Sequence, residues 1–199
     1  MNEEGTRVRL SQEGSDEAFT ELIDAYQTHV YNLCYRMLGD AQAAEDAAQE
    51  TFLRAYENLH RYDDRRPFGT WLLSIAAHYC IDRLRRRKFS FTSTDEDPGQ
   101  DSLDLPDPDA PSPEIETIHR EQREQMQLML NRLNAVDRAA IVLRYWQDAS
   151  EAEIAETLGL TVSAVKSRLH RARRELADHW QEAQPRTSAA RSPHESLAL

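Results

Sequence analysis

Apolar residues in the first half of the chain recur every three or four positions, which is the period of an amphipathic helix. The first such stripe consists of Phe19, Leu22, Ile23, Tyr26, Val30, Leu33, Met37 and Leu38. Ser15 precedes the stripe and can cap the helix, while Gly39 follows it and can adopt the left-handed conformation that ends a helix. The pattern therefore predicts one long helix between these two residues.

Two more helices are expected before residue 90. Asp40 can cap the first of them. Its expected buried stripe is Ala44, Ala48, Phe52, Ala55 or Tyr56, and Leu59. A charged, turn-prone loop follows from Arg61 to Pro67, and a third helix then runs through Trp71 to Lys88. The front half of this third helix is apolar and aromatic, whereas its end is cationic.

The second half of the chain repeats the helical period. The apolar positions of its first two expected helices are Ile115, Ile118, Met126, Met129 and Leu133, then Ile141, Val142, Tyr145 and Trp146. Ser150 and Glu153 form a capping-box pattern for a short helix, which Gly159 can end. A last helix starts near Thr161 and buries Val165, Leu169, Ala172 and Leu176.

The segment between the two halves has a different composition. It holds five of the eight prolines, and from Asp95 to Glu116 it has nine acidic residues with no Lys or Arg. Such a segment cannot bury enough apolar surface to offset the entropy of ordering it. We therefore expect an all-α protein with two small helical domains, at 15–90 and 114–182, an acidic Pro-rich flexible linker at 91–113, and a disordered tail at 183–199.

The distribution of charge matters more than its total. A net charge of −11 disfavours nucleic acid as a partner, but nine of the acidic residues lie in the one stretch from Asp95 to Glu116. The basic residues cluster elsewhere, as Arg83, Arg85, Arg86, Arg87 and Lys88 and as Lys166, Arg168, Arg171, Arg173 and Arg174. Two local cationic surfaces are therefore available for nucleic acid.

A short helix, a glycine turn and a longer helix with a basic face are typical of a helix-turn-helix, whose second helix enters the DNA major groove. At about 100° per residue, the buried stripe leaves Ser163, Ser167, His170, Arg171 and Arg174 outward, flanked by Lys166, Arg173 and Arg168. Polar residues near the start can reach base edges, and the cations can reach phosphates or guanine. The alternative is a basic helix without a ligand, although no acidic residue from 166 to 174 could neutralise the stretch from within.

In the first half, aromatic residues lie beside cations. Phe68, Trp71 and Tyr79 precede the basic run, and aromatic side chains with phosphate-binding charges suit single-stranded nucleic acid. The alternative for Trp71 is a place in the core, because it shares helical spacing with apolar neighbours. A third surface, around Asp46, would by itself be a solvated acidic face.

Catalytic and metal-binding patterns are missing from the sequence. It has no His-Glu-x-x-His, no glycine-rich phosphate loop, and its seven histidines share no metal-ligand spacing. Cys34 and Cys80 fit buried free thiols in a reducing cytosol. The first ten residues lack the apolar core of a signal peptide, and no apolar run is long enough for a membrane span. We expect neither an enzyme nor a cofactor.

Three segments resemble, in order, the motifs of bacterial RNA polymerase sigma factors of the extracytoplasmic-function (ECF) group. They are DAAQETFLRAY at 46–56, TWLLSIAAHYCIDRLRRR at 70–87 and EIAETLGLTVSAVKSRLHRARREL at 153–176. The resemblance implies a cytoplasmic transcription initiation factor that directs core RNA polymerase to promoter DNA. It also implies an anti-sigma factor as a partner. The linker is similar to the connector of that group.

The resemblance also implies residue roles. Asp46, Gln49, Glu50 and Leu53 would bind the polymerase clamp helices. The −10 element would be bound as an unpaired strand by Phe68, Trp71, His78, Arg83, Arg85, Arg86, Arg87 and Lys88, with the loop 61–69 helping to form a base pocket. The −35 element would be bound as duplex by Ser163, Lys166, Ser167, Arg168, His170, Arg171, Arg173 and Arg174. His78 stands where relatives commonly have Asn, Ala164 where Thr is frequent, and Asn134 where Pro commonly opens a helix.

Two other readings remain open from the residues. A stand-alone helix-turn-helix regulator would bind palindromic duplex unaided, and a response regulator would need alternating strands and helices in its first domain. A helical enzyme or metal protein is the second alternative.

Overall fold

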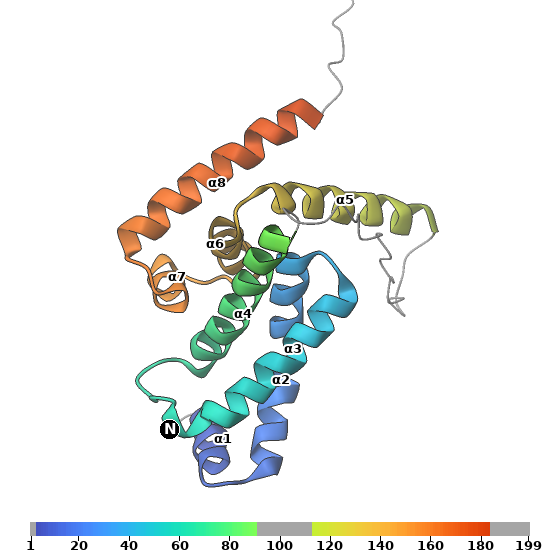
Figure 1. Cartoon of the computed structure of the whole chain (residues 1–199). Helices are drawn as coiled ribbons and strands as arrows, with labels where there is room; N and C mark the ends of the chain where they lie inside the picture. The colour runs from blue at the N-terminus through green and yellow to red at the C-terminus, as the bar shows by residue number, and fades with distance from the viewer. Residues whose placement is uncertain (1–2, 91–112, 184–199) are drawn as a thin grey trace, which may run out of the picture.

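The computed structural model describes residues 3–90 and 113–183, apart from the side chains of 88–90, 113–120 and 182–183. The helices are α1 (Glu3–Gln12), α2 (Asp16–Leu38), α3 (Ala41–Asn58), the 3₁₀ turn η1 (Leu59–Arg61), α4 (Phe68–Ser90), α5 (Pro113–Arg132), α6 (Ala135–Trp146), α7 (Glu151–Leu158) and α8 (Val162–Ala183). Every regular element in these two ranges is helical, so the predicted all-α class is confirmed (Figure 1). The expected linker and tail lie almost wholly outside the described residues.

The predicted helix ends in the first half are confirmed. The Ser15 hydroxyl accepts from the Ala18 amide at 3.2 Å, and the Asp40 carboxylate accepts from the Ala43 amide at 2.7 Å. Gly39 has φ 75°, the left-handed conformation that a C-terminal cap requires. These local signals place α2, α3 and their tight connection, and α4 then packs against both helices.

The buried face of α3 is rotated from the predicted stripe by about one residue. Ala44 and Ala55 are buried as expected, but Ala47 and Thr51 are the other buried positions, and Phe52 is only half-buried. Small residues suit a helix that packs between α2 and α4. The Thr51 hydroxyl donates to the Ala47 carbonyl at 2.7 Å, so its polar group is satisfied inside.

The second half contains the predicted helix-turn-helix. Ser150 and Glu153 form a complete capping box at the start of α7, and Gly159 ends that helix with φ 63°. Thr161 caps α8 by accepting from the Ala164 amide at 3.2 Å. Asn134 accepts from the Asp137 amide at 3.0 Å, so it does cap α6. Figure 1 shows α8 crossing above α6 and α7.

The two halves touch each other, which the sequence did not predict. Helix α7 packs against α4, and α6 packs against α2 and α4. The C-terminal end of α2 accepts two hydrogen bonds from the second half: Gln127 Nε2 to the Arg36 carbonyl at 3.1 Å and Arg138 Nη1 to the Met37 carbonyl at 2.6 Å. The buried apolar residues form one cluster that continues across this contact.

Helix α1 is a further addition to the expected fold. It packs on α2 through buried Val8 and Ser11, and it also reaches η1 and α4. The first helical unit of the structure therefore includes residues before Ser15. Cys34 and Cys80 are free and buried, as predicted. In the described part of the chain, no helix has the length and apolar character needed to cross a membrane.

Candidate polymerase-docking and DNA-contacting surfaces

The α3 surface, made of Asp46, Gln49, Glu50 and Leu53, lies on one side of its helix because the spacing is three to four residues. Leu53 is 53% exposed, which is unusual for a leucine in an otherwise polar face. Gln49 is exposed and Glu50 is half-buried. An exposed leucine ringed by carboxylate and amide groups has the make-up of a protein-binding surface.

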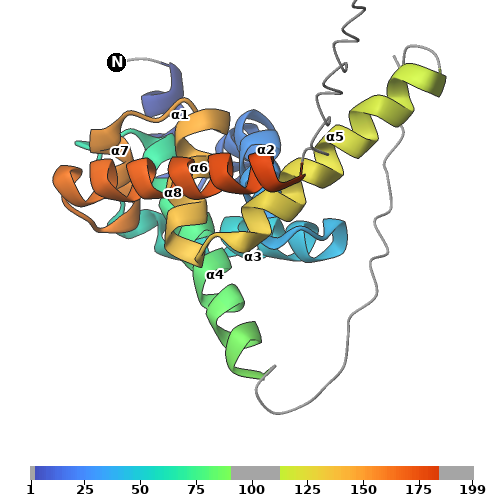
Figure 2. The same cartoon turned by 90° about the horizontal axis from the view of Figure 1, so that it is seen from above.

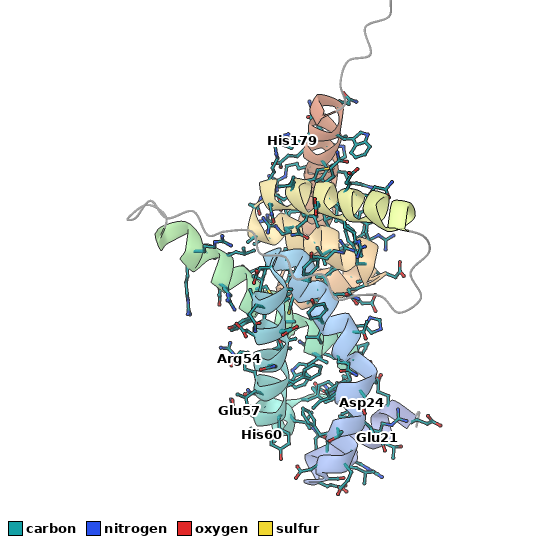
Figure 3. All side chains as sticks on the ribbon, turned by 90° about the vertical axis from the view of Figure 1, so that its right-hand side faces the viewer. Glu21, Asp24, Arg54, Glu57, His60 and His179 are labelled. Atoms are coloured by element: carbon teal, nitrogen blue, oxygen red, sulfur yellow. The ribbon has the colours of Figure 1, made fainter. Side chains whose placement is uncertain are left out.

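The carboxylates of the α3 surface have cationic neighbours. Arg54 Nε lies 2.7 Å from Glu50 Oε1, and Arg83 Nη2 lies 4.0 Å from Asp46 Oδ2. Figure 3 shows Arg54 and Glu57 along the same outer edge of the first half, away from Glu21 and Asp24 on α2. These pairs are solvent-accessible and individually weak, so a partner can replace them at small cost.

Four aromatic rings gather where the loop after η1 enters α4. Phe68 lies edge-on to Tyr26 and Tyr62, with centroids 5.5 and 5.7 Å away. Trp71 packs on Tyr62 at 5.1 Å and on Phe68 at 5.6 Å. Phe68 is only 2% exposed, so it belongs to the core in this structure and offers no stacking surface. Trp71 keeps a partly exposed ring.

His78 lies about two helical turns beyond Trp71, on the exposed side of α4. Its Nδ1 is 2.7 Å from the Ser74 carbonyl. A carbonyl can only accept, so Nδ1 must carry the proton, and in the neutral ring Nε2 is then an outward acceptor. The side chain therefore presents one acceptor, whereas the Asn common in the resembling family presents an acceptor and a donor.

The end of α4 is strongly cationic. Arg85, Arg86 and Arg87 are exposed, Arg83 is half-buried, and the side chain of Lys88 lies outside the described residues. Arg85 pairs with Asp82 at 3.7 Å. Figure 2 shows this half of α4 projecting from the body of the molecule. A phosphate backbone can approach it from several directions.

The outward face of α8 is exposed as predicted. Its exposed members are Ser163, Lys166, Ser167, His170, Arg171, Arg173 and Arg174. Acidic residues from outside the basic stretch lie near two of them: Glu151 is 3.6 Å from Lys166, and Asp178 is 4.0 Å from Arg174. Both are long surface contacts, so the face remains cationic.

Arg168 is placed differently from the other basic residues of α8. Its Nη1 donates to Asp137 Oδ1 at 2.7 Å, and the Asp137 side chain is 6% exposed. Asn134 donates to the other oxygen of Asp137 at 2.7 Å. Arg168 therefore fastens α8 to α6 in this structure. The sequence signal for this role would have been Asp137 in the first turn of α6, but it lies 31 residues away.

Among the described residues, no cluster of three His, Cys, Asp or Glu side chains is placed to hold a metal ion. The described residues instead present three exposed surfaces. They are the α3 surface, the −10 surface made of the loop 61–69 and the exposed side of α4, and the outer face of α8.

The family comparisons decide between the readings left open by the residues. Residues 22–90 match sigma-70 region 2, and residues 123–176 match sigma-70 region 4. The ECF RNA polymerase sigma factor SigW of Bacillus subtilis (strain 168) is 38% identical over 173 residues, which cover 85% of this chain and 92% of SigW. The chain belongs to the ECF sigma factors.

Solved structures show the same fold for this ECF sigma factor. The structure of CnrH in complex with the cytosolic domain of CnrY matches with a TM-score of 0.68 at 22% identity, covering 90% of this chain and 97% of the other. The sigma factor RpoE, in complex with the anti-sigma factor NepR from Bartonella quintana, matches with a TM-score of 0.61 at 21% identity, covering 83% and 98%. The region 2 match runs from within α2 to the end of α4, and the region 4 match runs from within α5 to within α8.

Proposed function

We propose that this ECF sigma factor docks on core RNA polymerase through the α3 surface and contacts promoter DNA with two separate cationic surfaces. The outer face of α8 contacts the −35 element as duplex, and the loop with α4 contacts the −10 element as an unpaired strand. One observation carries this division: the two cationic surfaces lie on different helices, and neither includes the exposed, leucine-centred patch on α3. The polymerase supplies the chemistry.

The −35 contact is supported by the exposure of the α8 face. Ser163 and Ser167 lie near the start of the helix, where small side chains let the backbone approach base edges. Arg171 and Arg174 lie further along and can reach guanine or phosphate. Because Arg168 is engaged with Asp137, it contributes to this site by holding α8 in place.

The −10 contact is supported by a partly exposed Trp71, the exposed acceptor of His78 and the cations of α4. Capture of an unpaired base needs a stacking surface and a hydrogen-bonding group at the pocket wall. The acceptor on His78 can take a hydrogen bond from an amino or imino group of an unpaired base. The arginines of α4 then hold the phosphates of the same strand.

In the arrangement seen here, the protein cannot contact the −35 and −10 elements at the same time. The −35 and −10 elements lie about 25 base pairs apart, roughly 85 Å at 3.4 Å per pair. Arg66 lies in the loop between η1 and α4, which we call the −10 loop. Its Nε is 2.9 Å from Oε1 of Glu156 on α7, the helix that precedes α8. We therefore infer that the two halves separate when the promoter is bound.

An anti-sigma factor is the expected regulatory partner. RpoE, which has the same fold, was solved in complex with such a factor. Binding of an inhibitor across both halves would block the α3 surface or keep the halves together. As a subunit of RNA polymerase, the protein would act in the cytoplasm.

The docking surface is tested by affinity for core RNA polymerase. We expect the double variant Asp46→Ala, Leu53→Ala to bind core at least about tenfold more weakly, because it removes the charged and the apolar centre of the patch. Glu45→Ala is the matched control, since it removes an exposed carboxylate on the same helix next to Asp46. Run-off transcription with core on genomic fragments then reports promoter choice. Equal binding by all three proteins, or no association of the wild-type chain with core, would overturn the proposal.

A further inference from the structure

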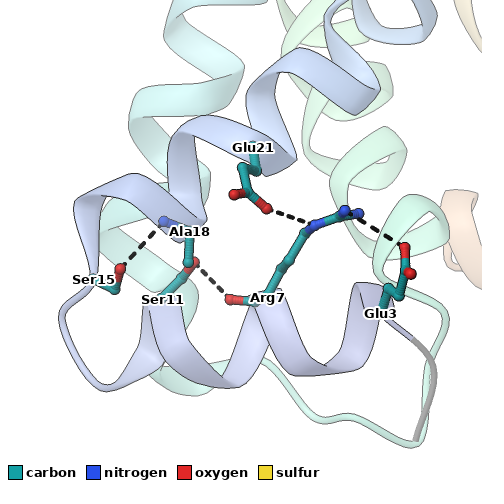
Figure 4. A network of polar contacts seen from close by, with 6 residues as sticks. All are labelled: Glu3, Arg7, Ser11, Ser15, Ala18 and Glu21. Atoms are coloured by element: carbon teal, nitrogen blue, oxygen red, sulfur yellow. Dashed lines mark hydrogen bonds and ion pairs between the residues drawn. The ribbon is translucent and has the colours of Figure 1, made fainter.

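Helix α1 precedes the region 2 match, which begins at residue 22. It is fastened along α2 by an ion pair of Arg7 with Glu21 at 2.7 Å, supported by Glu3 at 3.7 Å (Figure 4). The Ser11 hydroxyl donates to the Arg7 carbonyl at 2.8 Å, and Val8 is 4% exposed against the core. The helix thus has a defined position over α2. From that position it reaches both η1 and α4.

The first contact of α1 with the −10 loop is made by Gln12. Its Nε2 donates to the Leu59 carbonyl at 3.0 Å and to the Tyr62 carbonyl at 3.3 Å. These carbonyls stand at the start and just after the end of η1. One amide group therefore holds the segment from which the loop departs.

The second contact is made by Glu4 through Tyr26. The Tyr26 hydroxyl donates to Glu4 Oε2 at 2.5 Å, and its ring lies against Gly69, in the first turn of α4. Burial and the neighbouring Glu4 carboxylate both raise the pKa of Tyr26, so the hydroxyl keeps its proton and remains a donor. Glu4 and Tyr26 therefore connect α1 to the start of α4.

Gly69 shows how closely this second contact is fitted. A Cβ atom at that position would lie 2.9 Å from Tyr26 Cε1, closer than carbon atoms pack. Glycine lets the Tyr26 ring lie against the first turn of α4. The Tyr26 ring also packs edge-on against Phe68.

The loop between these two contacts has one ion pair with another element, Arg66 Nε to Glu156 Oε1 at 2.9 Å, and this pair is lost when the two halves separate. Residues 63–67 are all exposed. Tyr62 donates from its hydroxyl to the Arg66 carbonyl, which shapes the loop internally. The position of such a loop is set mainly at its two ends, and α1 reaches both.

We propose that Gln12 and Glu4 are positioning residues for the −10 contact. They hold the two ends of the loop 62–67 in place, and this preorganises the wall of the pocket that receives the unpaired base. The inference rests on the proposed function of that loop. A preorganised pocket binds its base without the cost of ordering the loop at that moment. Neither residue touches DNA: Gln12 acts through the loop backbone, and Glu4 acts through Tyr26.

The test measures, for the full chain with core polymerase, affinity for fork DNA with an unpaired −10 strand. We expect Gln12→Ala and Glu4→Leu each to weaken this binding about three- to tenfold, the effect of a lost hydrogen bond. Glu13→Ala and Glu13→Leu are the matched controls, because Glu13 is an exposed residue just after α1 whose ion pair with Arg9 at 3.9 Å lies outside both contacts, and both should bind as the wild type does. Glu4→Gln keeps an oxygen that accepts from Tyr26, so it should restore most of the affinity.

Two further measurements separate positioning from a general loss of structure. Affinity for core polymerase and binding of −35 duplex should remain at the wild-type level in all variants. Tyr26→Phe, which keeps the ring, should weaken fork binding, and adding Glu4→Leu to it should cause no additional loss, because Glu4 acts through the missing hydroxyl.

The inference is overturned if Gln12→Ala and Glu4→Leu bind fork DNA as tightly as the wild type. It is also overturned if core affinity falls in parallel with fork binding, since that would show a merely structural role. Should Glu4→Leu unfold, Tyr26→Phe and Glu4→Gln supply the same comparison. A wild-type chain that binds core but not the unpaired strand would instead refute the proposed −10 function.

Discussion

The two surfaces that we propose contact DNA are built in different ways. The outer face of α8 follows from signals within about 25 residues: the capping box at Ser150, the turn at Gly159 and the apolar stripe that begins at Val165. The −10 surface depends on contacts between distant residues, such as Gln12 with Leu59, 47 positions apart. A regular helix in a local motif carries its outward face in its own sequence, whereas a loop takes its position from whatever holds its ends.

Among the predictions, the largest effect is expected when the Phe68 ring is removed from the −10 surface. We expect Phe68→Ala to lower the free energy of unfolding by about 3–5 kcal/mol, because the side chain is 2% exposed and the cavity would remain partly empty. Chemical denaturation measures this change. Phe68→Leu, which keeps most of the volume, should cost clearly less. An alanine variant as stable as the wild type would show that the ring cluster contributes no packing.

A second prediction separates two arginines of α8. Arg168→Ala should lower the free energy of unfolding by about 2 kcal/mol, because Asp137 would lose its charged partner while staying buried. Arg171→Ala, the matched control on the exposed face, should leave stability unchanged and weaken binding to a cognate −35 duplex by about 1–3 kcal/mol. Thermal unfolding and duplex titration over a range of salt would record both. The reverse pattern would exchange the roles assigned to these residues.

The smallest predicted effect concerns the cap of α7. Ser150→Ala should cost about 1 kcal/mol of stability at neutral pH, since a first-turn amide loses its acceptor. Hydrogen bonds with Ser150 lower the pKa of Glu153. The stabilisation by Glu153 is therefore present above its unfolded pKa and is lost as pH falls through its folded pKa. The difference between Ser150→Ala and wild type should shrink in acid, and a constant difference in denaturation from pH 7 to 3 would contradict the capping box.

Much of the fold could be predicted because its signals are local. The caps at Ser15, Asp40 and Ser150 and the left-handed Gly39 and Gly159 appear where the sequence places them. The outward side of α8 also follows from periodicity alone. These features need only a few neighbouring residues.

The structure differs from the sequence-based expectation where a distant residue determines the surroundings of a side chain. Arg168 lies beside the predicted DNA-contacting face, but Asp137 holds it. Phe68 reads as a possible stacking ring, but Tyr26 and Tyr62 enclose it. Helix α1 has few apolar residues and no clear periodicity, so only the acidic first turn at Glu3 and Glu4 could have indicated it. The contact between the two halves was also missed, because polar side chains make part of it.

The last turn of α2 has an unusual property in this respect. Helix C-terminal carbonyls normally face water, but those of Arg36 and Met37 accept hydrogen bonds from Gln127 and Arg138 of the other half. Burial lowers the pKa of Arg138 to about 10. Its guanidinium would regain water if the halves separated, because its hydrogen bond to Met37 joins the two halves. Carbon-13 labels at these two carbonyls would report whether the halves separate, because their NMR chemical shifts change when the hydrogen bonds are lost. Such labels leave every proposed binding surface unchanged.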